Sequence, residues 1–386
     1  MSADYALPAG IRSRMVSGVN GLTMHVLEAG FETPGRPALL LLHGFPELAY
    51  SWRKVMLPLA EAGHHVIAPD QRGYGRTVRT DGDDADYNSY DSDLTPFRLL
   101  NLVRDAIGLA SALGYRSVAA VVGHDFGSPV AAWCALLRPD VFRSVVLMSA
   151  PFAGPPALPF NTAGQPAPAA AADIHAALAA LPRPRKHYQW HYSTREADHA
   201  MHHAPQGLTA FLRAYYHVKS ADWAQNQPCT LKSWTAEELA KMPGYYIMDL
   251  AKNMAEMVAP EMPSNLEISG CKWLTDAELS VYAGEFGRTG FQGALQWYRC
   301  RTSGRFNGEL EVFSGWRIDV PALFIAGKAD WGPFQRPGDI EAMRDQACSR
   351  LLGCHTVDGA GHWVQQEQPE QVVALVLRFM REQATA

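Results

Sequence analysis

Short apolar runs alternate with helical patterns along the first 150 residues, and this alternation constrains the fold more than any other feature. The runs lie at 38–43, 65–69, 117–122 and 145–149. Runs of this kind are typical of strands buried on both faces of a sheet. The segments 94–113 and 126–137 have helical periodicity, and 11–17 with 22–28 predict an antiparallel pair. Strand–helix–strand repetition predicts a mostly parallel sheet with helices on both faces.

The strand–helix pattern is interrupted in the middle of the chain. Residues 153–186 are rich in Ala and Pro, which favours a partly extended connection. From 187 to 301 the signals are helical, with many aromatic and Met residues and no clear strand. We therefore expect a sheet domain made of residues 1–152 and 302–386, and a connection followed by a helical cap domain over 153–301. The returning sheet pattern is expected at 320–326 and 354–357, with a last amphipathic helix over 368–381.

Composition excludes several classes of protein. The net charge of −5 and the absence of a Lys/Arg-rich run provide no basic surface for nucleic acid or an anionic membrane. No window approaches the roughly 18 apolar residues that a membrane helix needs. The N-terminal residues lack the apolar stretch of a signal peptide, and none of the six cysteines forms a C-x-x-C pair. We expect a cytoplasmic protein with reduced thiols.

The strongest local signal is Gly123-His124-Asp125-Phe126-Gly127, between a buried strand and a helix. A G-x-nucleophile-x-G turn needs small flanking residues, because the strained turn lifts the central side chain above the sheet. The motif alone is weak, since Asp between glycines is often a simple turn residue. The strand–turn–helix context makes Asp125 a candidate nucleophile.

Two further candidates follow the last predicted strands. Asp330 comes four residues after the strand residue Ala326, and His362 follows the final strand. Each alone has an ordinary structural interpretation, such as a helix N-cap for Asp330. Together with Asp125 they have the chain order nucleophile, acid, histidine, and all three follow the carboxyl ends of parallel strands, where open sheets place their sites.

The segment His43-Gly44-Phe45-Pro46 directly follows the first parallel strand. The backbone N–H groups of Phe45 and Phe126 are expected to form an oxyanion hole. We expect His43 to be structural and to anchor this loop.

A carboxylate nucleophile indicates a particular chemistry. If Ser attacked a carbon that bears no carbonyl, it would leave an ether, which water does not readily cleave. Asp125 would instead form an ester, whose carbonyl can be attacked by water that His362 deprotonates. The turn therefore favours alkylation of the enzyme, as in epoxide opening, over esterase or lipase action.

These segments resemble the soluble-type epoxide hydrolases of the α/β-hydrolase superfamily. The similarity covers most of the chain and includes HGFPE (His43–Glu47), YSWR (Tyr50–Arg53), DQRGYG (Asp70–Gly75) and GHDFG (Gly123–Gly127). The family usually has Trp where this chain has Phe126. The resemblance implies an α/β-hydrolase fold with a helical cap, no cofactor and no metal. It also implies that a small apolar epoxide and water are converted to a vicinal diol through an alkyl-aspartyl ester.

The family also uses two cap tyrosines, which bind the epoxide oxygen and donate a proton to it. The segments HYQW and GALQWYR resemble their motifs, which implies roles for Tyr188 and Tyr298. Tyr192 lies four residues after Tyr188, so it would share a helix face with it and remains an alternative for the first tyrosine. The substrate pocket is expected to include Pro46, Trp190, Trp297 and Trp363.

Two other functions remain open. Haloalkane dehalogenases share the fold and the Asp nucleophile, but Phe45 and Phe126 lack the side-chain N–H that would bind a halide. Haloacid enzymes would need a basic residue for the substrate carboxylate, and Arg72 does not discriminate because many relatives share it. A non-catalytic binding protein on this scaffold would be expected to have lost a site residue, and none is missing.

His187 and His191 have the i, i+4 spacing of a metal site. No H-E-x-x-H pattern accompanies them, so we expect no metal. The sequence leaves homo-oligomerisation open.

Overall fold

The protein is described by a computed structural model that covers residues 6–80, 88–163, 166–168 and 173–384. A nine-stranded sheet has the strand order β1-β2-β4-β3-β6-β7-β10-β11, and β5 pairs with β2. The strands are β1 (Ile11–Val19), β2 (Leu22–Ala29), β3 (Ala38–Leu42), β4 (His65–Pro69), β5 (Val78–Arg79), β6 (Ala120–His124), β7 (Val145–Met148), β10 (Ala322–Gly327) and β11 (Leu351–Val357). All pairs from β4 to β11 along this order are parallel. The carboxyl ends of these strands therefore meet at one edge.

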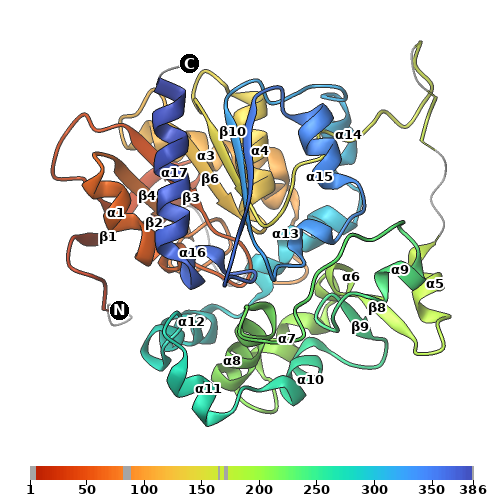
Figure 1. Cartoon of the computed structure of the whole chain (residues 1–386). Helices are drawn as coiled ribbons and strands as arrows, with labels where there is room; N and C mark the ends of the chain where they lie inside the picture. The colour runs from red at the N-terminus through yellow and green to blue at the C-terminus, as the bar shows by residue number, and fades with distance from the viewer. Residues whose placement is uncertain (1–5, 81–87, 164–165, 169–172, 385–386) are drawn as a thin grey trace.

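Helices cover both faces of the sheet (Figure 1). The helices α1 (Arg53–Glu61) and α17 (Pro369–Ala384) share one hydrophobic cluster with Leu39 and Leu41 of β3. The helices α3 (Leu99–Ala112) and α4 (Gly127–Leu137) share the other cluster with the alternate residues of the same strand. Because successive strand side chains point to opposite faces, a continuous apolar run fills both clusters.

Most of the segment between β7 and β10 forms a helical layer beside the carboxyl edge of the sheet, at the lower side of Figure 1. Its elements are α5 (Ile174–Ala179), β8 (Arg185–His187), α6 (Tyr188–Tyr192), α7 (Glu196–His202), α8 (Leu208–Lys219), α9 (Ala236–Leu239), β9 (Ile247–Asp249), α10 (Met254–Val258), α11 (Asn265–Gly270), α12 (Asp276–Thr289) and α13 (Gln292–Thr302). The next helix, α14 (Asn307–Glu311), lies beside the sheet instead, at the upper right of Figure 1. Capping boxes begin α10, α11 and α12, where Asn, Ser or Thr is followed three residues later by Glu.

The sequence expectations for the sheet are confirmed, with small changes of boundary. The antiparallel pair β1–β2 and the strand His65–Pro69 are present. The strand expected at 117–122 lies instead at Ala120–His124. The helix expected from residue 94 begins at Leu99, after a 3₁₀ turn that contains Pro96.

The expectation that no strand occurs between 187 and 301 is wrong. β8 and β9 form an antiparallel pair of three residues each, with His187 opposite Ile247. Three residues are too few for a period-two pattern to show in a sequence. Part of the Ala/Pro-rich connection, at 164–165 and 169–172, lies outside the described residues, and the rest contains the short helix α5.

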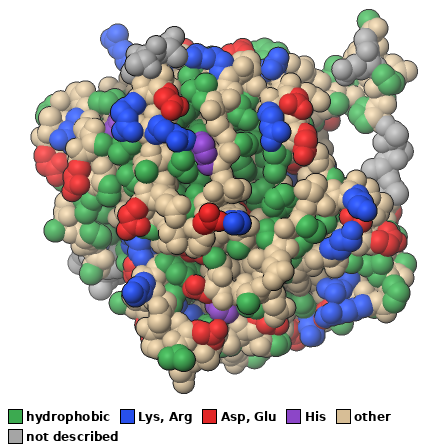
Figure 2. Space-filling model, in the orientation of Figure 1, with side chains coloured by type: hydrophobic (Ala, Val, Ile, Leu, Met, Phe, Trp, Pro, Cys, Tyr) green, Lys and Arg blue, Asp and Glu red, His purple; other side chains and the backbone are tan. Residues whose placement is uncertain are grey.

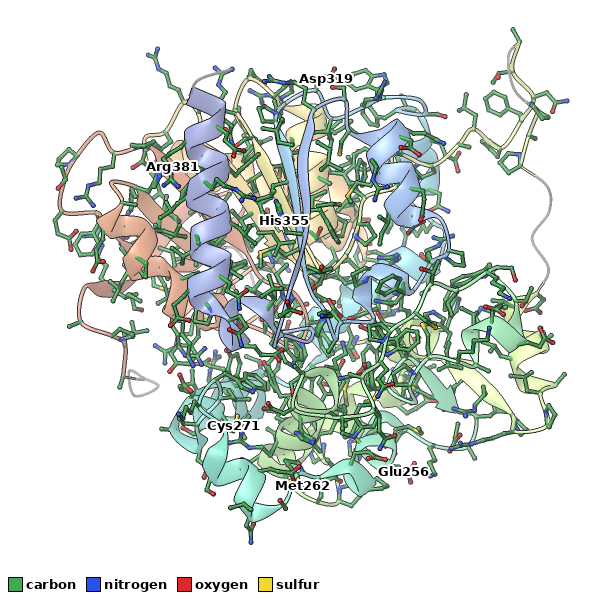
Figure 3. The ribbon with its side chains drawn as sticks, in the orientation of Figure 1. Glu256, Met262, Cys271, Asp319, His355 and Arg381 are labelled. Atoms are coloured by element: carbon green, nitrogen blue, oxygen red, sulfur yellow. The ribbon has the colours of Figure 1, made fainter. Side chains whose placement is uncertain are left out.

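Acidic and basic side chains are interspersed with apolar ones on the face shown in Figure 2. Among the residues that the structure describes, no helix is both long and apolar enough to cross a membrane. In Figure 3, Cys271 and Met262 mark the outer side of the helical layer, whereas His355 on β11 lies beside α17.

Candidate active site

Asp125 occupies the sharp turn between β6 and α4. Its φ of 51° lies in the left-handed region, which non-glycine residues rarely adopt. The first and last residues of the motif must be glycine. A Cβ on Gly123 would lie 2.1 Å from the carbonyl oxygen of Gly127. A Cβ on Gly127 would lie 2.2 Å from the carbonyl oxygen of Leu42 on β3. The turn is thus pressed against the neighbouring strand and projects the carboxylate beyond the sheet edge.

The loop after β3 donates a hydrogen bond to this carboxylate. The backbone N–H of Phe45 donates to Oδ1 of Asp125 over 2.9 Å. The second expected donor, Phe126, immediately precedes α4, and its ring packs edge-on against Tyr298 at 5.1 Å between centroids. His43 anchors the loop as expected, because its Nε2 accepts from the N–H of Gln71 over 3.1 Å.

The three residues predicted to act together do meet at the carboxyl edge. Nε2 of His362 lies 3.3 Å from Oδ2 of Asp125, and Nδ1 of His362 donates to Oδ1 of Asp330 over 3.0 Å. The same Asp330 oxygen accepts the N–H of Gly332 over 2.7 Å. This arrangement orients the imidazole with Nε2 towards Asp125, the geometry of a base held by an acid.

The charges around Asp125 favour its ionised form. Burial raises the pKa of this carboxyl, but His362, Lys219 and His124 lower it more strongly, and the pKa falls well below its ordinary value. Burial also raises the pKa of Asp330, and the interaction with His362 brings it below its ordinary value. Both carboxyl groups are therefore anionic across neutral pH.

A second pair of buried ionisable groups, which sequence reasoning missed, lies directly behind the first. Nδ1 of His124 is 2.6 Å from Oε2 of Glu47, and its Nε2 is 2.7 Å from the carbonyl oxygen of His362. Both residues belong to motifs quoted above, HGFPE and GHDFG, so their presence was visible in the sequence. Their pairing was not, because 77 residues separate them.

The rings of the two tyrosines expected to bind the epoxide oxygen lie side by side, close enough to Asp125 to feel its charge. The rings of Tyr188 and Tyr298 are 6.0 Å apart between centroids, and the ring of Tyr298 lies 5.4 Å from that of Phe45. Burial and the charge of Asp125 raise the pKa of Tyr188, and burial raises that of Tyr298. Both phenols are therefore protonated and able to donate.

The hydroxyls of the two candidates for the first tyrosine face different partners. The hydroxyl of Tyr188 donates to Oε1 of Gln335 over 3.1 Å, which links α6 to the loop after β10. The hydroxyl of Tyr192 donates to that of Tyr215 over 3.2 Å. Tyr192 thus has its proton engaged with another buried phenol of the helical layer.

Three of the four expected pocket residues lie near the reacting groups. Trp297 packs against the ring of Phe126 at 5.3 Å, and Trp363 packs against the ring of His362 at 4.7 Å. The carbonyl of Pro46 accepts the hydroxyl of Tyr216 over 2.8 Å. Trp190 is partly buried, and its ring packs against that of His175 at 4.4 Å and that of His187 at 5.0 Å.

Lys219 is a further residue that sequence reasoning missed. It ends α8, and its carbonyl accepts the N–H of His362 over 2.8 Å. Its ammonium is buried among the rings of Tyr215, Tyr246 and Trp363, at 5.2, 5.0 and 5.6 Å. The aromatic residues that flank it in the sequence YYHVKSADW were its only signal.

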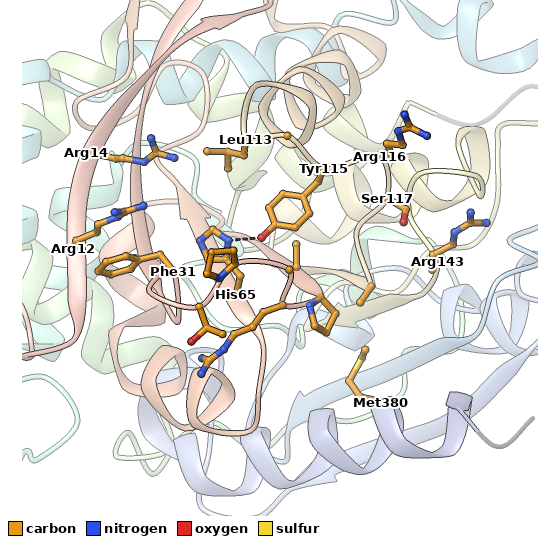
Figure 4. Close-up of a pocket in the computed structure, with 18 of the residues that line it drawn as sticks. Arg12, Arg14, Phe31, His65, Leu113, Tyr115, Arg116, Ser117, Arg143 and Met380 are labelled. Carbon is orange, nitrogen blue, oxygen red and sulfur yellow. Dashed lines mark hydrogen bonds between the residues drawn. The ribbon is translucent and has the colours of Figure 1, made fainter.

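A cavity of about 890 Å³ lies at the opposite ends of the strands (Figure 4). It is lined by five arginines, by Phe31, and by His65 hydrogen-bonded to Tyr115. It contains none of the predicted site residues and is not the candidate active site. Within the described part of the chain, no group of three or more His, Cys, Asp or Glu side chains is placed to hold a metal ion.

A parallel sheet with an Asp at its strand–helix turn, faced by a His–Asp pair, defines an α/β hydrolase. A sequence profile of the alpha/beta hydrolase fold matches residues 37–369. Epoxide hydrolase A of Mycobacterium tuberculosis is 33% identical over 385 residues, which cover 96% of this chain and 98% of the relative. Epoxide hydrolase B of the same organism is 33% identical over 352 residues, 89% of this chain and 91% of the relative. The chain belongs to the epoxide hydrolase family within the α/β-hydrolase superfamily.

Solved structures agree with this assignment. An epoxide hydrolase from an endophytic Streptomyces superimposes with a TM-score of 0.71 at 28% identity, over 98% of both chains. Potato (Solanum tuberosum) epoxide hydrolase I superimposes with a TM-score of 0.69 at 27% identity, over 96% of this chain and 99% of the other.

Proposed function

We propose that this chain is an epoxide hydrolase in which Asp125 is the covalent nucleophile. The observation that carries the proposal is the position of its carboxylate. Asp125 lies between the Phe45 N–H on one oxygen and His362 beside the other, and the ring of Tyr298, next to that of Tyr188, packs against Phe45 and Phe126. A carboxylate placed this way can attack a ring carbon while a phenol protonates the oxygen that leaves it.

In the first step, Oδ2 of Asp125 attacks one epoxide carbon, and the bond from that carbon to the ring oxygen breaks. The oxygen takes a proton from Tyr188 or Tyr298, which leaves a β-hydroxyalkyl ester and a tyrosinate. In the resting protein the Tyr188 hydroxyl is engaged with Gln335. The epoxide oxygen would therefore replace the Gln335 carboxamide as its acceptor.

In the second step, His362 removes a proton from water, and the hydroxide adds to the ester carbonyl carbon. The resulting oxyanion accepts hydrogen bonds from the backbone N–H of Phe45 and, in this proposal, from that of Phe126. Collapse breaks the ester bond, and His362 returns its proton to the leaving alkoxide, which releases the diol. The proton on the new carboxyl group of Asp125 passes to the tyrosinate left by the first step, so that the carboxylate and the phenol are both restored. Asp330 stabilises the imidazolium between these transfers.

The proposal includes residues 153–301 as the cap domain over an α/β-hydrolase core of 1–152 and 302–386. It takes Trp297, Trp363 and Pro46 as pocket walls, and it assigns a cytoplasmic location. The substrates are an epoxide and water, with no cofactor. The dehalogenase alternative gains no support from the oxyanion loop, where Phe45 and Phe126 offer no side-chain donor to a halide.

The test is a single turnover of aryl and alkyl epoxides in ¹⁸O-labelled water. We expect unlabelled diol in the first turnover, because its new oxygen comes from the protein, and label in the Asp125 peptide afterwards. Asp125→Asn, which keeps the shape of the side chain, is the matched control and should give no diol. Labelled diol in the first turnover would show direct attack by water and would contradict the covalent step.

A further inference from the structure

Lys219 is a buried cation that the proposed reaction does not use. Lys219 is the last residue of α8 and is 2% exposed. The rings of three tyrosines and one tryptophan surround its ammonium, at 5.0–5.9 Å from the nitrogen to the ring centroids. Among the described residues no carboxylate lies within 4.0 Å of it. An ammonium removed from water is costly unless it is paired. Aromatic faces attract it only in part.

The carboxylates in the neighbourhood of Lys219 already have partners of their own. Asp330 is bonded to His362 at 3.0 Å, and Glu47 is paired with His124 at 2.6 Å. Asp125 would lose its charge when it becomes an ester. In the covalent intermediate, Lys219 would therefore be the cation of the site that lacks an anion of its own.

A second unpartnered donor lies beside this ammonium. Tyr246 is 1% exposed, and its hydroxyl is buried without a hydrogen-bond partner. Its ring lies 5.0 Å from the ammonium of Lys219. Burial raises the pKa of Tyr246, so the hydroxyl keeps its proton. A buried donor without an acceptor costs free energy, and one anionic group with several lone pairs could satisfy both donors.

The two donors lie next to the reacting groups. The ring of Tyr246 is 5.1 Å from that of Tyr188, which would bind the epoxide oxygen. The ring of Trp363 is 5.6 Å from the ammonium and 4.7 Å from the ring of His362. The ammonium therefore lies between the ring of Tyr246, which contacts the proton donor Tyr188, and the ring of Trp363, which contacts the base His362. A group held there would belong to the same substrate molecule.

We propose that Lys219 and Tyr246 form a subsite for a carboxylate carried by the epoxide substrate. This inference rests on the proposed function, because it names the class of epoxide that the site prefers. The carboxylate would accept a charge-assisted hydrogen bond from Lys219 and a second one from the Tyr246 hydroxyl. Its charge would replace that of Asp125 as the counter-ion of Lys219 after alkylation.

The test compares ω-carboxylated terminal epoxides of increasing chain length with their carboxamides, which match them in shape but lack charge. For the protein as it stands, kcat/KM should favour the acid over the amide at one or more lengths. Lys219→Met should reduce that ratio by about 10- to 100-fold, the effect of losing a hydrogen bond to a charged group. Tyr246→Phe should reduce it by a smaller factor, and it leaves no bonding partner unsatisfied in the protein.

An acid-to-amide ratio that is the same in the parent protein and in Lys219→Met at every length would overturn the inference. Binding of straight-chain carboxylates and their amides, measured by calorimetry without turnover, separates this result from failure of the proposed function. Selective binding of carboxylates that Lys219→Met abolishes would support the subsite even if no epoxide were hydrolysed. Equal binding of acids and amides by the parent protein would overturn it even if epoxides were hydrolysed.

Discussion

His124 places both ring nitrogens against acceptors, the Glu47 carboxylate at 2.6 Å and the carbonyl oxygen of His362 at 2.7 Å. Neither acceptor carries a proton to give when Glu47 is ionised, so both nitrogens must donate and the ring is an imidazolium. Burial lowers the pKa of His124, but Glu47 raises it more, to about 9. A buried ion pair thus supports the backbone of His362.

The pair predicts how stability depends on pH. The pKa of His124 in the folded protein, about 9, exceeds the ordinary value near 6.5. Its stabilising contribution is therefore complete below about pH 6.5 and is lost as the pH rises through 9. Glu47→Gln should lower the free energy of unfolding at pH 6 by about 3–5 kcal/mol. Between pH 6 and pH 9 the variant should then lose less stability than the parent, because it has no ion pair left to lose. Urea titrations at several pH values measure both effects.

Glu32→Gln, at an exposed position, is the matched control for that experiment. It should leave the free energy of unfolding within about 0.5 kcal/mol of the parent. If Glu47→Gln behaved in the same way, His124 and Glu47 would not form the ion pair described.

His362→Gln should separate the two chemical steps. Gln keeps a polar side chain in place but cannot remove a proton from water, so alkylation should proceed and hydrolysis should stall. Intact-mass spectrometry should then show the protein heavier by one epoxide, with the added mass on the Asp125 peptide. The double variant Asp125→Asn/His362→Gln should show no added mass. Normal turnover by His362→Gln would remove this residue from the second step.

The three tyrosines should differ in their effect on ring opening. Tyr298→Phe and Tyr188→Phe should each slow alkylation by on the order of 10²–10⁴-fold, the usual contribution of a general acid. Tyr192→Phe should change it much less, because its hydroxyl already donates to Tyr215. Rapid-mixing measurements of ester formation test this order. A larger effect for Tyr192→Phe than for Tyr188→Phe would reverse the assignment of the first tyrosine.

Gly127→Ala should damage the turn that holds the nucleophile. The new Cβ would lie 2.2 Å from the carbonyl oxygen of Leu42 and 2.6 Å from that of His43, and these backbone atoms cannot move without displacing β3. We expect a loss of about 1–3 kcal/mol from overpacking, measured by thermal or urea unfolding, together with a lower rate of alkylation. Gly284→Ala in α12, where a Cβ has open space, is the control and should be at least as stable as the parent, because Ala is favoured over Gly inside a helix.

Sequence alone predicted much of the site, because its residues follow the ends of parallel strands. Asp125, Asp330 and His362 were expected to meet for that reason, and they do. The pairing of Glu47 with His124 and the burial of Lys219 could not be predicted, since both depend on how separate loops and helices pack. The contacts of Trp190 with His175 and His187 could not be predicted for the same reason.

β11 is the last strand of the chain and also an edge of the sheet. The loop that follows it carries His362, so the base reaches Asp125 only after every other strand has been made and this final edge has been added. A chain truncated before this loop would keep the sequence of the nucleophile turn but lack His362, the group that regenerates Asp125 in the proposed mechanism. In the proposed mechanism, repeated turnover therefore requires the complete sheet, and a truncated copy that still formed the nucleophile turn would be alkylated once and not regenerated.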